Sequence, residues 1–155
     1  MLFRSNQHLI ADGAMGNAML NIAHTKASLA FVPAFVLGVF CNALVCMAVW
    51  MCFGARTTSG RILAIVPPIA AFVAASFEHS VANMYFIPVA LFVKSGAAPE
   101  FFEKIHKTAA DFPNLTWSKF LIGNLIPVTL GNIIGGGGLV GAMYWFIYLR
   151  RAKRG

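Results

Sequence analysis

An acid, a histidine and an amide stand together in an apolar part of this sequence. Glu78, His79 and Asn83 lie in the middle of a run from about Ile62 to Val93 that is otherwise almost wholly apolar. In hydrocarbon, an ionisable side chain is costly unless it meets a partner or lines a water-filled path. We therefore regard these residues as a candidate functional site of a membrane-embedded protein.

Two further amides from other apolar runs would lie at the same depth. Asn42 is near the centre of a run over about 29–54, and Asn132 is near the centre of a run over about 120–149. Counting from the ends of each run puts both amides level with His79. Three separate segments therefore converge on one layer, although asparagines at this depth can also serve only as hydrogen bonds between helices.

The local spacing indicates different tasks for the two ionisable groups. If the segment is helical, His79 and Asn83 are four residues apart and share a face, so that the amide can hold one imidazole nitrogen and fix the tautomer. Glu78 would point about 100° away. Its nearest candidate counter-charge is Lys26, whose alternative role is to reach the membrane interface. Alternatively, His79 could be a structural histidine whose imidazole forms hydrogen bonds between packed helices.

Other chemistry finds little support in the sequence. A single histidine at mid-depth argues against a haem subunit, which would use two facing histidines. Cys41, Cys46 and Cys52 match neither a redox pair nor a zinc site, so we expect packed thiols. Nothing resembles a hydrolase triad or a phosphate-binding loop. We expect no enzyme activity, no cofactor and no metal.

The elements that carry these residues are predicted to be three transmembrane helices. The chain is 59% hydrophobic and 11% charged, whereas soluble domains are about 45–50% apolar and about 25% charged. Each apolar run exceeds the roughly 20 residues that a helix needs to cross a bilayer. The fold class is an all-α integral membrane protein with spans at about 29–54, 62–93 and 120–149. Residues 1–28 mix polar and apolar side chains and favour an amphipathic, interfacial segment.

The middle span is expected to be broken. Pro67 and Pro68 lie early in it and Pro88 lies late, and proline removes backbone hydrogen bonds. The run is also longer than a simple crossing requires. Broken helices are tolerated at membrane depth where protein or a water-lined cavity satisfies the freed groups, and transporters build substrate sites there. The alternative is a tilted, proline-kinked helix.

The basic residues predict the orientation of the chain. The net charge is +7, but the tail 150–155 holds four basic residues directly after the last span, as the positive-inside rule expects of a cytoplasmic end. This explanation needs no nucleic-acid partner. The loop 55–60 would then also be cytoplasmic, and the mixed-charge loop 94–119 would face the other side.

The third span is rich in glycine. Gly131 and Gly135 are four residues apart, as are Gly137 and Gly141, and this spacing permits close contact between membrane helices. We expect tight packing there, and a glycine hinge is the alternative.

Three ordered segments resemble the formate/nitrite transporter family, whose members are pentameric channels for small monovalent anions. Residues 77–88 (FEHSVANMYFIP) resemble the signature in the family's broken fifth helix, residues 124–136 (NLIPVTLGNIIGG) resemble its sixth helix, and residues 41–50 (CNALVCMAVW) its fourth. The resemblance covers nearly the whole chain. It implies the second inverted repeat of an aquaporin-like six-helix channel in the inner (plasma) membrane, and a homo-pentamer when the protein is complete.

The resemblance also implies roles for individual residues. The resemblance implies that His79 is the central pore histidine that relays protons and that Asn83 is its amide neighbour. Glu78, Lys26 and Asn42, supported by Asn132, would form the polar network behind them. Val45 and Phe72 would form the apolar constrictions on either side.

The chain resembles only the second half of such a channel. The first three helices are missing, together with a loop whose threonine would face the histidine, so this half alone should not close a pore. A truncated reading frame, a split gene or a deliberate truncation would each explain this. The implied function is passage of formate or nitrite, with protons, across a lipid bilayer. An accessory membrane subunit whose polar residues only join helices is the alternative. A water or glycerol channel would require Asn-Pro-Ala turns, which the sequence lacks.

Overall fold

The computed structural model describes residues 6–150, which form helices and contain no strand. The expected all-α class is confirmed. The chain divides into two compact units, of which unit 1 comprises Met1–Phe31 and Val81–Ile126, and unit 2 comprises Val32–Ser80 and Pro127–Gly155. Arg151, Lys153 and Arg154 of the predicted cytoplasmic tail lie outside the described residues.

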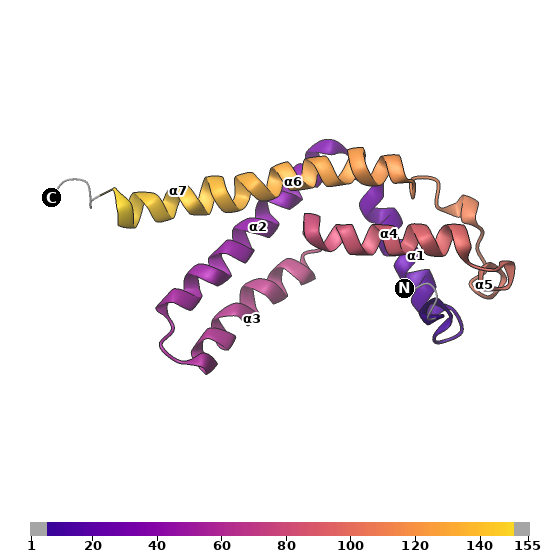
Figure 1. Cartoon of the computed structure of the whole chain (residues 1–155), viewed down its shortest axis with the longest axis horizontal. Coiled ribbons are helices and arrows are strands. Elements are labelled where there is room, and N and C mark those ends of the chain that lie inside the picture. Colours follow the sequence, from indigo (N-terminus) through magenta and orange to yellow (C-terminus); the bar gives the residue numbers. More distant parts are fainter. Residues whose placement is uncertain (1–5, 151–155) are drawn as a thin grey trace. The chain divides into compact units, whose positions relative to one another are not determined.

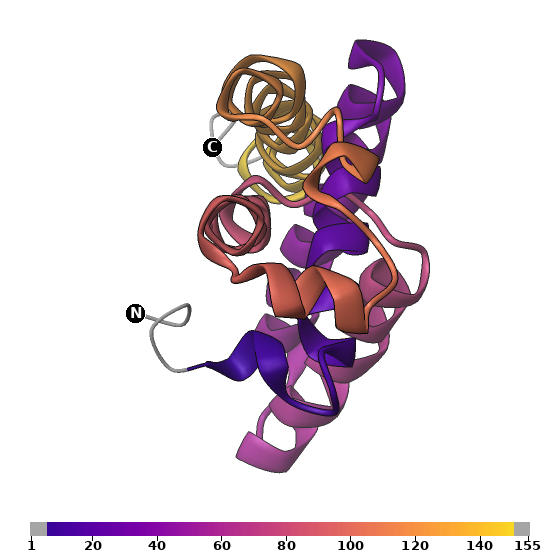
Figure 2. The same ribbon diagram turned by 90° about the vertical axis from the view of Figure 1, so that its right-hand side faces the viewer.

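Unit 1 has a core of aliphatic and aromatic side chains. Its helices are α1 (Ala14–Ala27), nearly all of α4 (Ser80–Gly96), α5 (Pro99–Lys104) and a π-helical segment, Lys119–Leu125; short 3-10 turns occur at Gln7–Leu9 and Ala109–Asp111. The core contains Leu20 and Ala23 from α1, Ile87, Ala90, Leu91 and Val93 from α4, and Phe101, Phe112, Leu115 and Phe120. The helix α5 lies beside α1 (Figure 2), where Phe101 packs on Gly16.

Polar side chains fix the loop between α4 and the last helix to the rest of unit 1. The amine of Lys94 donates to two loop carbonyls, Phe112 O at 2.7 Å and Leu115 O at 3.0 Å. A third bond runs from Asn114 Nδ2 to Ser28 Oγ at 3.1 Å. The loop is therefore an ordered part of this unit.

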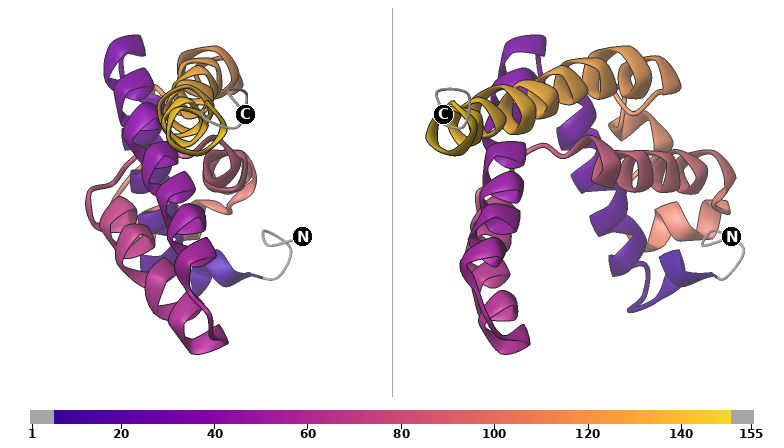
Figure 3. Two further views of the ribbon diagram at one scale, coloured as in Figure 1. Left: turned by 90° about the vertical axis from the view of Figure 1, so that its left-hand side faces the viewer. Right: turned by 60° about the vertical axis from the view of Figure 1, so that its left-hand side comes forward.

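Unit 2 contains a helical hairpin, α2 (Phe31–Gly54) and α3 (Thr58–Ala74), whose two helices run side by side (Figures 1 and 3). The turn between them ends at Thr57, whose Oγ1 accepts a hydrogen bond from Gly60 N at 3.1 Å and caps α3. The thiol of Cys52 donates to Arg61 O at 3.7 Å across the hairpin. None of the three cysteines forms a disulfide; Cys41 is buried, and Cys46 and Cys52 are half-buried.

The last helical stretch runs without interruption over Lys119–Leu149. Within it, α6 (Ile126–Ile133) and α7 (Gly141–Tyr144) alternate with π-helical segments, Ile134–Val140 and Trp145–Leu149. In unit 2, this stretch contacts α2 closely. A Cβ atom added at Gly131 or Gly135 would overlap the backbone of Phe35 or Val39, respectively. The expected tight packing is therefore present at Gly131 and Gly135. It is absent at the second pair, because nothing lies within 4 Å of a Cβ atom added at Gly137, and one at Gly141 would meet only Gly136 O of the same helix, at 3.6 Å.

Within residues 6–150, two helices are long and apolar enough to cross a membrane, Phe31–Gly54 and Lys119–Leu149. They coincide with the first and third predicted spans. The middle predicted span is divided between α3 and α4, which have 17 residues each. Three crossings therefore stay a prediction.

Candidate functional site

The expected break in the middle segment is present. α3 ends at Ala74 and α4 begins at Ser80, and residues 75–79 connect them without being helical. The three prolines of this segment lie inside α3 and α4 rather than at the break. Because His79 precedes the first residue of α4, the helical spacing considered for His79 and Asn83 does not apply.

Ser76 turns the chain at the end of α3. Its N–H donates to Val73 O at 3.0 Å, and the N–H of Phe77 donates to Phe72 O at 3.1 Å. This is the Schellman pattern, which satisfies the last carbonyls of a helix and usually places glycine in the left-handed position. Ser76 occupies that position with φ 53°, at a cost of about 1–2 kcal/mol for an L-residue.

Aromatic rings flank the break within unit 2. His79 is half-buried, and its ring centroid lies 6.3 Å from that of Phe72, with the planes tilted by 41°. Phe77 stacks on Phe40 of α2, with centroids 5.9 Å apart. Glu78 is buried. The imidazole therefore meets an apolar ring on the side of α3.

The side chain of Asn132 joins the break to α2. Its Nδ2 donates to Gly38 O at 2.9 Å and to Glu78 O at 3.0 Å. Its Oδ1 accepts from the N and from the Oγ of Ser80, each at 3.0 Å. Asn42 adds another link, because its Nδ2 donates to Asn132 O at 2.6 Å. Three segments of unit 2 thus meet at one buried asparagine.

A second buried asparagine, Asn124, organises polar groups in unit 1. Its Oδ1 accepts from Asn83 Nδ2 at 2.8 Å, and its Nδ2 donates to Lys26 O at 3.0 Å. Both Asn83 and Asn124 are fully buried. The orientation of the Asn83 side chain is therefore set by Asn124.

The structure brings several of the predicted site residues together within each unit. In unit 2, Asn42, Asn132 and the backbone of Glu78 meet, and Phe72 lies beside His79. Val45 is half-buried on α2, about one turn after Asn42, and its place at a constriction stays a prediction, as does the pairing of Lys26 with Glu78.

Sequence reasoning missed Asn124, Ser80 and Gly38. Asn124 had a usable signal, because it is a second amide about two turns before Asn132 in the same apolar run. Gly38 bonds to Asn132 through its backbone carbonyl, and a carbonyl partner cannot be recognised from the type of residue.

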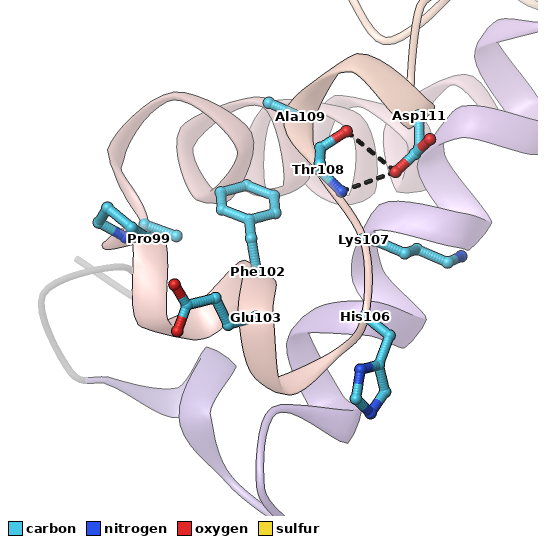
Figure 4. Close-up of a pocket in the computed structure, with 9 residues that line it drawn as sticks. Pro99, Phe102, Glu103, His106, Lys107, Thr108, Ala109 and Asp111 are labelled. Carbon is cyan, nitrogen blue, oxygen red and sulfur yellow. Dashed lines mark hydrogen bonds between the residues drawn. The ribbon is translucent and has the colours of Figure 1, made fainter.

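An open pocket of about 780 Å³ in unit 1 is lined by residues between 97 and 111 (Figure 4). Its charged lining residues include Glu103 and Lys107. Thr108 donates to Asp111 Oδ2 through its N at 2.6 Å and its Oγ1 at 3.0 Å, and these bonds hold the pKa of Asp111 below its usual value. No cluster of three histidine, cysteine or carboxylate side chains suited to a metal occurs in residues 6–150. The charged side chains that line this pocket have both signs.

The comparison with known families favours one of the remaining interpretations. A family model described as formate/nitrite transporter matches residues 1–146. The chain belongs to the formate/nitrite transporter family. It is accordingly a membrane protein, and membership supports, at the level of the family, the expectation of a transporter rather than an enzyme.

Relatives within the formate/nitrite transporter family are similar over nearly the whole chain. The formate channel FocA of Escherichia coli (strain K12) is 43% identical over 97% of this chain and 53% of its own length. The formate channel FocA of Haemophilus influenzae is 37% identical over 95% of this chain and 52% of its own length. The chain thus spans about half the length of these relatives.

A solved structure supports the same assignment. A pentameric formate channel with formate bound is 40% identical, with a TM-score of 0.89, and the match covers 96% of this chain and 58% of that one. The fold of this family member is therefore similar to that of the matching part of a formate channel.

Proposed function

We propose that the protein is part of a channel or transporter that passes formate, nitrite or a similar small monovalent anion across the plasma membrane. The observation that carries the proposal is the helix break at residues 75–79, which places His79 at the start of α4 in a chain of this family. The likeness to formate channels gives the substrate class its support.

His79 acts as a proton relay in this proposal. A bare anion that crosses an apolar constriction bears a large desolvation cost, whereas the neutral acid bears far less. The imidazolium of His79 gives its proton to formate, formic acid moves on, and the neutral imidazole takes a new proton from water. The alternative is that the anion crosses charged, held by cationic His79 and the Asn83 amide.

Proton movement distinguishes these two mechanisms. A pH-sensitive dye inside vesicles should report one proton entering with each formate if the relay operates. A formate flux without acidification of the interior would favour passage of the charged anion.

The remaining residues support the pore. We assign Val45 and Phe72 to the apolar constrictions on either side of the histidine, and the Phe72 ring beside His79 supports its part. Glu78 and Lys26 form the polar network behind His79, to which Asn42 and Asn132 also contribute through their bonds near the break.

The complete assembly is proposed to be a homo-pentamer of subunits that each contain a second, N-terminal half. The chain spans about half the length of its relatives, and the similar formate channel is pentameric. In this arrangement the present residues cross the membrane three times, as the second inverted repeat, with a cytoplasmic C-terminus.

Co-expression with a matching N-terminal three-helix partner tests this function. We expect a pentamer by native mass spectrometry and formate uptake after reconstitution into liposomes. Absence of both pentamer and uptake would favour the accessory membrane subunit, an interpretation that membership of a transporter family does not favour.

A further inference from the structure

One side chain is bonded to both of the peptide groups that flank His79. The carbonyl of Glu78 belongs to the peptide before the histidine, and the N–H of Ser80 belongs to the peptide after it. Asn132 Nδ2 donates to Glu78 O at 3.0 Å, and Asn132 Oδ1 accepts from Ser80 N at 3.0 Å. A single amide thus constrains the two peptide planes on either side of His79.

The amide of Asn132 has no spare hydrogen-bonding capacity. A carboxamide offers two N–H donors and two acceptor lone pairs. The second donor bond of Asn132 goes to Gly38 O at 2.9 Å, and the second acceptor site takes Ser80 Oγ at 3.0 Å. The side chain is also buried, with 6% exposed. Its four sites are occupied by protein groups, so none is left for a passing anion.

Asn132 is itself held in place by close helix packing. Asn42 Nδ2 donates to Asn132 O at 2.6 Å. A Cβ atom on Gly38 would lie 2.8 Å from Val128 O and 3.3 Å from Asn132 Nδ2. The helices α2 and α6 are therefore in contact around this asparagine, and its amide has a fixed position relative to the break.

We propose that Asn132 is the positioning residue of the break, which sets the direction in which the His79 side chain leaves the backbone without touching the anion. This inference rests on the proposed function for the importance of His79. The chemistry requires an amide. Leucine at this position would lose the four side-chain bonds, and a carboxylate would keep the bonds from Ser80 but face the carbonyls of Gly38 and Glu78 with another oxygen.

Hydrogen exchange measured by mass spectrometry on the full protein in nanodiscs tests the proposal. In Asn132→Leu, we expect amide exchange of residues 77–80 to rise about tenfold, as the loss of hydrogen bonds should allow local opening. Asn124→Leu is the matched control, because it removes a buried asparagine of the same helix that bonds to other groups. It should leave exchange at residues 77–80 unchanged.

Ser80→Ala is a milder variant in case Asn132→Leu does not fold. It removes only the Oγ bond to Asn132 and should raise exchange at the break by about two- to threefold, the lower end of the effect of one hydrogen bond. Unchanged exchange at residues 77–80, or an equal rise throughout the chain, would overturn the proposal. Because exchange is measured without transport, a protein that lacks formate flux but shows the local rise would disprove the proposed function and retain the positioning role.

The pH profile of formate flux provides the second readout. If Asn132 directs the imidazole, Asn132→Leu should shift the midpoint of the profile, since the surroundings of His79 change. A lower flux with an unchanged midpoint would show a merely structural role and overturn the assignment.

Discussion

The helices of unit 2 meet through glycine, whereas those of unit 1 meet through large side chains. In unit 2, Gly131 and Gly135 bring the last helix against the backbone of α2. In unit 1, Phe101, Phe112 and other large residues fill the space between the helices. Contacts between backbones leave no room for adjustment, while side chains can move to new rotamers. We therefore expect unit 2 to tolerate small changes less well than unit 1.

The two buried asparagines of the last helix show the same contrast. The amide of Asn132, in unit 2, bonds to backbone atoms of three residues and to the Ser80 hydroxyl. Asn124, in unit 1, bonds to the side chain of Asn83 and to one carbonyl, Lys26 O. The first asparagine fixes the path of the chain, and the second fixes the orientation of a side chain.

The largest effect is expected at Gly135. Gly135→Ala should destabilise the protein by about 3 kcal/mol, because the new methyl group would overlap the carbonyl of Val39 and a backbone cannot yield as a side chain does. Gly137→Ala is the control, since nothing lies within 4 Å of its added Cβ. It should be neutral or gain helix propensity. Thermal unfolding in detergent, followed by tryptophan fluorescence, measures both, and equal melting temperatures would contradict the packing account.

A smaller effect is expected for Asn124. Asn124→Leu should cost about 2 kcal/mol, because it leaves the Asn83 amide and the Lys26 carbonyl with one fewer partner each. Hydrogen exchange should rise in α4 after residue 83 and not at residues 77–80. If hydrogen exchange instead rose at residues 77–80, the separate roles assigned to Asn124 and Asn132 would be wrong.

One helix end in each unit should gain from glycine. Ser76 lies two residues after the end of α3 and His106 two residues after the end of α5, and both have φ 53°. Replacing either by glycine relieves the left-handed strain but adds chain entropy to the unfolded state, so we expect a net gain of about 0.5 kcal/mol. Ala75→Gly, at a neighbouring residue with φ −78°, is the control and should give no gain. A lower melting temperature for Ser76→Gly would show that the serine is not strained.

The smallest effect concerns pH and Asp111, in the loop between α4 and the last helix. The folded pKa of Asp111 is lowered by the bonds from Thr108, so the unfolded carboxyl binds protons more readily and stability rises with pH in that window. The contribution is present above the unfolded pKa of about 3.9 and is lost as pH falls through the folded value. The melting temperatures of the parent and of Asp111→Asn should differ at pH 6, and the difference should shrink as pH falls from about 4 through the folded pKa of Asp111. A difference that does not depend on pH would exclude this cause.

The ionisable part of the site could be predicted from sequence because charges are conspicuous in an apolar run. Glu78 and His79 stand out for that reason, and the convergence of Asn42 and Asn132 follows from counting along the spans. The position of the break could not be derived in this way. The prolines suggested a break, yet they lie within the helices. The turn is made by Ser76 in a left-handed backbone conformation, which a serine in the sequence does not predict.

Residues that bond to Asn132 through their backbone could not be predicted from the sequence either. Gly38 and Glu78 bond to Asn132 by their carbonyls, and every residue has a carbonyl. Asn124 is different, because its side chain is polar and lies in an apolar run.

The pH dependence of formate flux in liposomes tests the central claim most directly, with the complete protein compared with its His79→Asn variant. Asparagine keeps hydrogen-bonding capacity but does not titrate near neutral pH. We expect the parent flux to change between about pH 5 and 8, the range in which histidine titrates, and the variant flux to be low and independent of pH. The same flux and the same pH dependence in both proteins would contradict the role of His79 as proton relay.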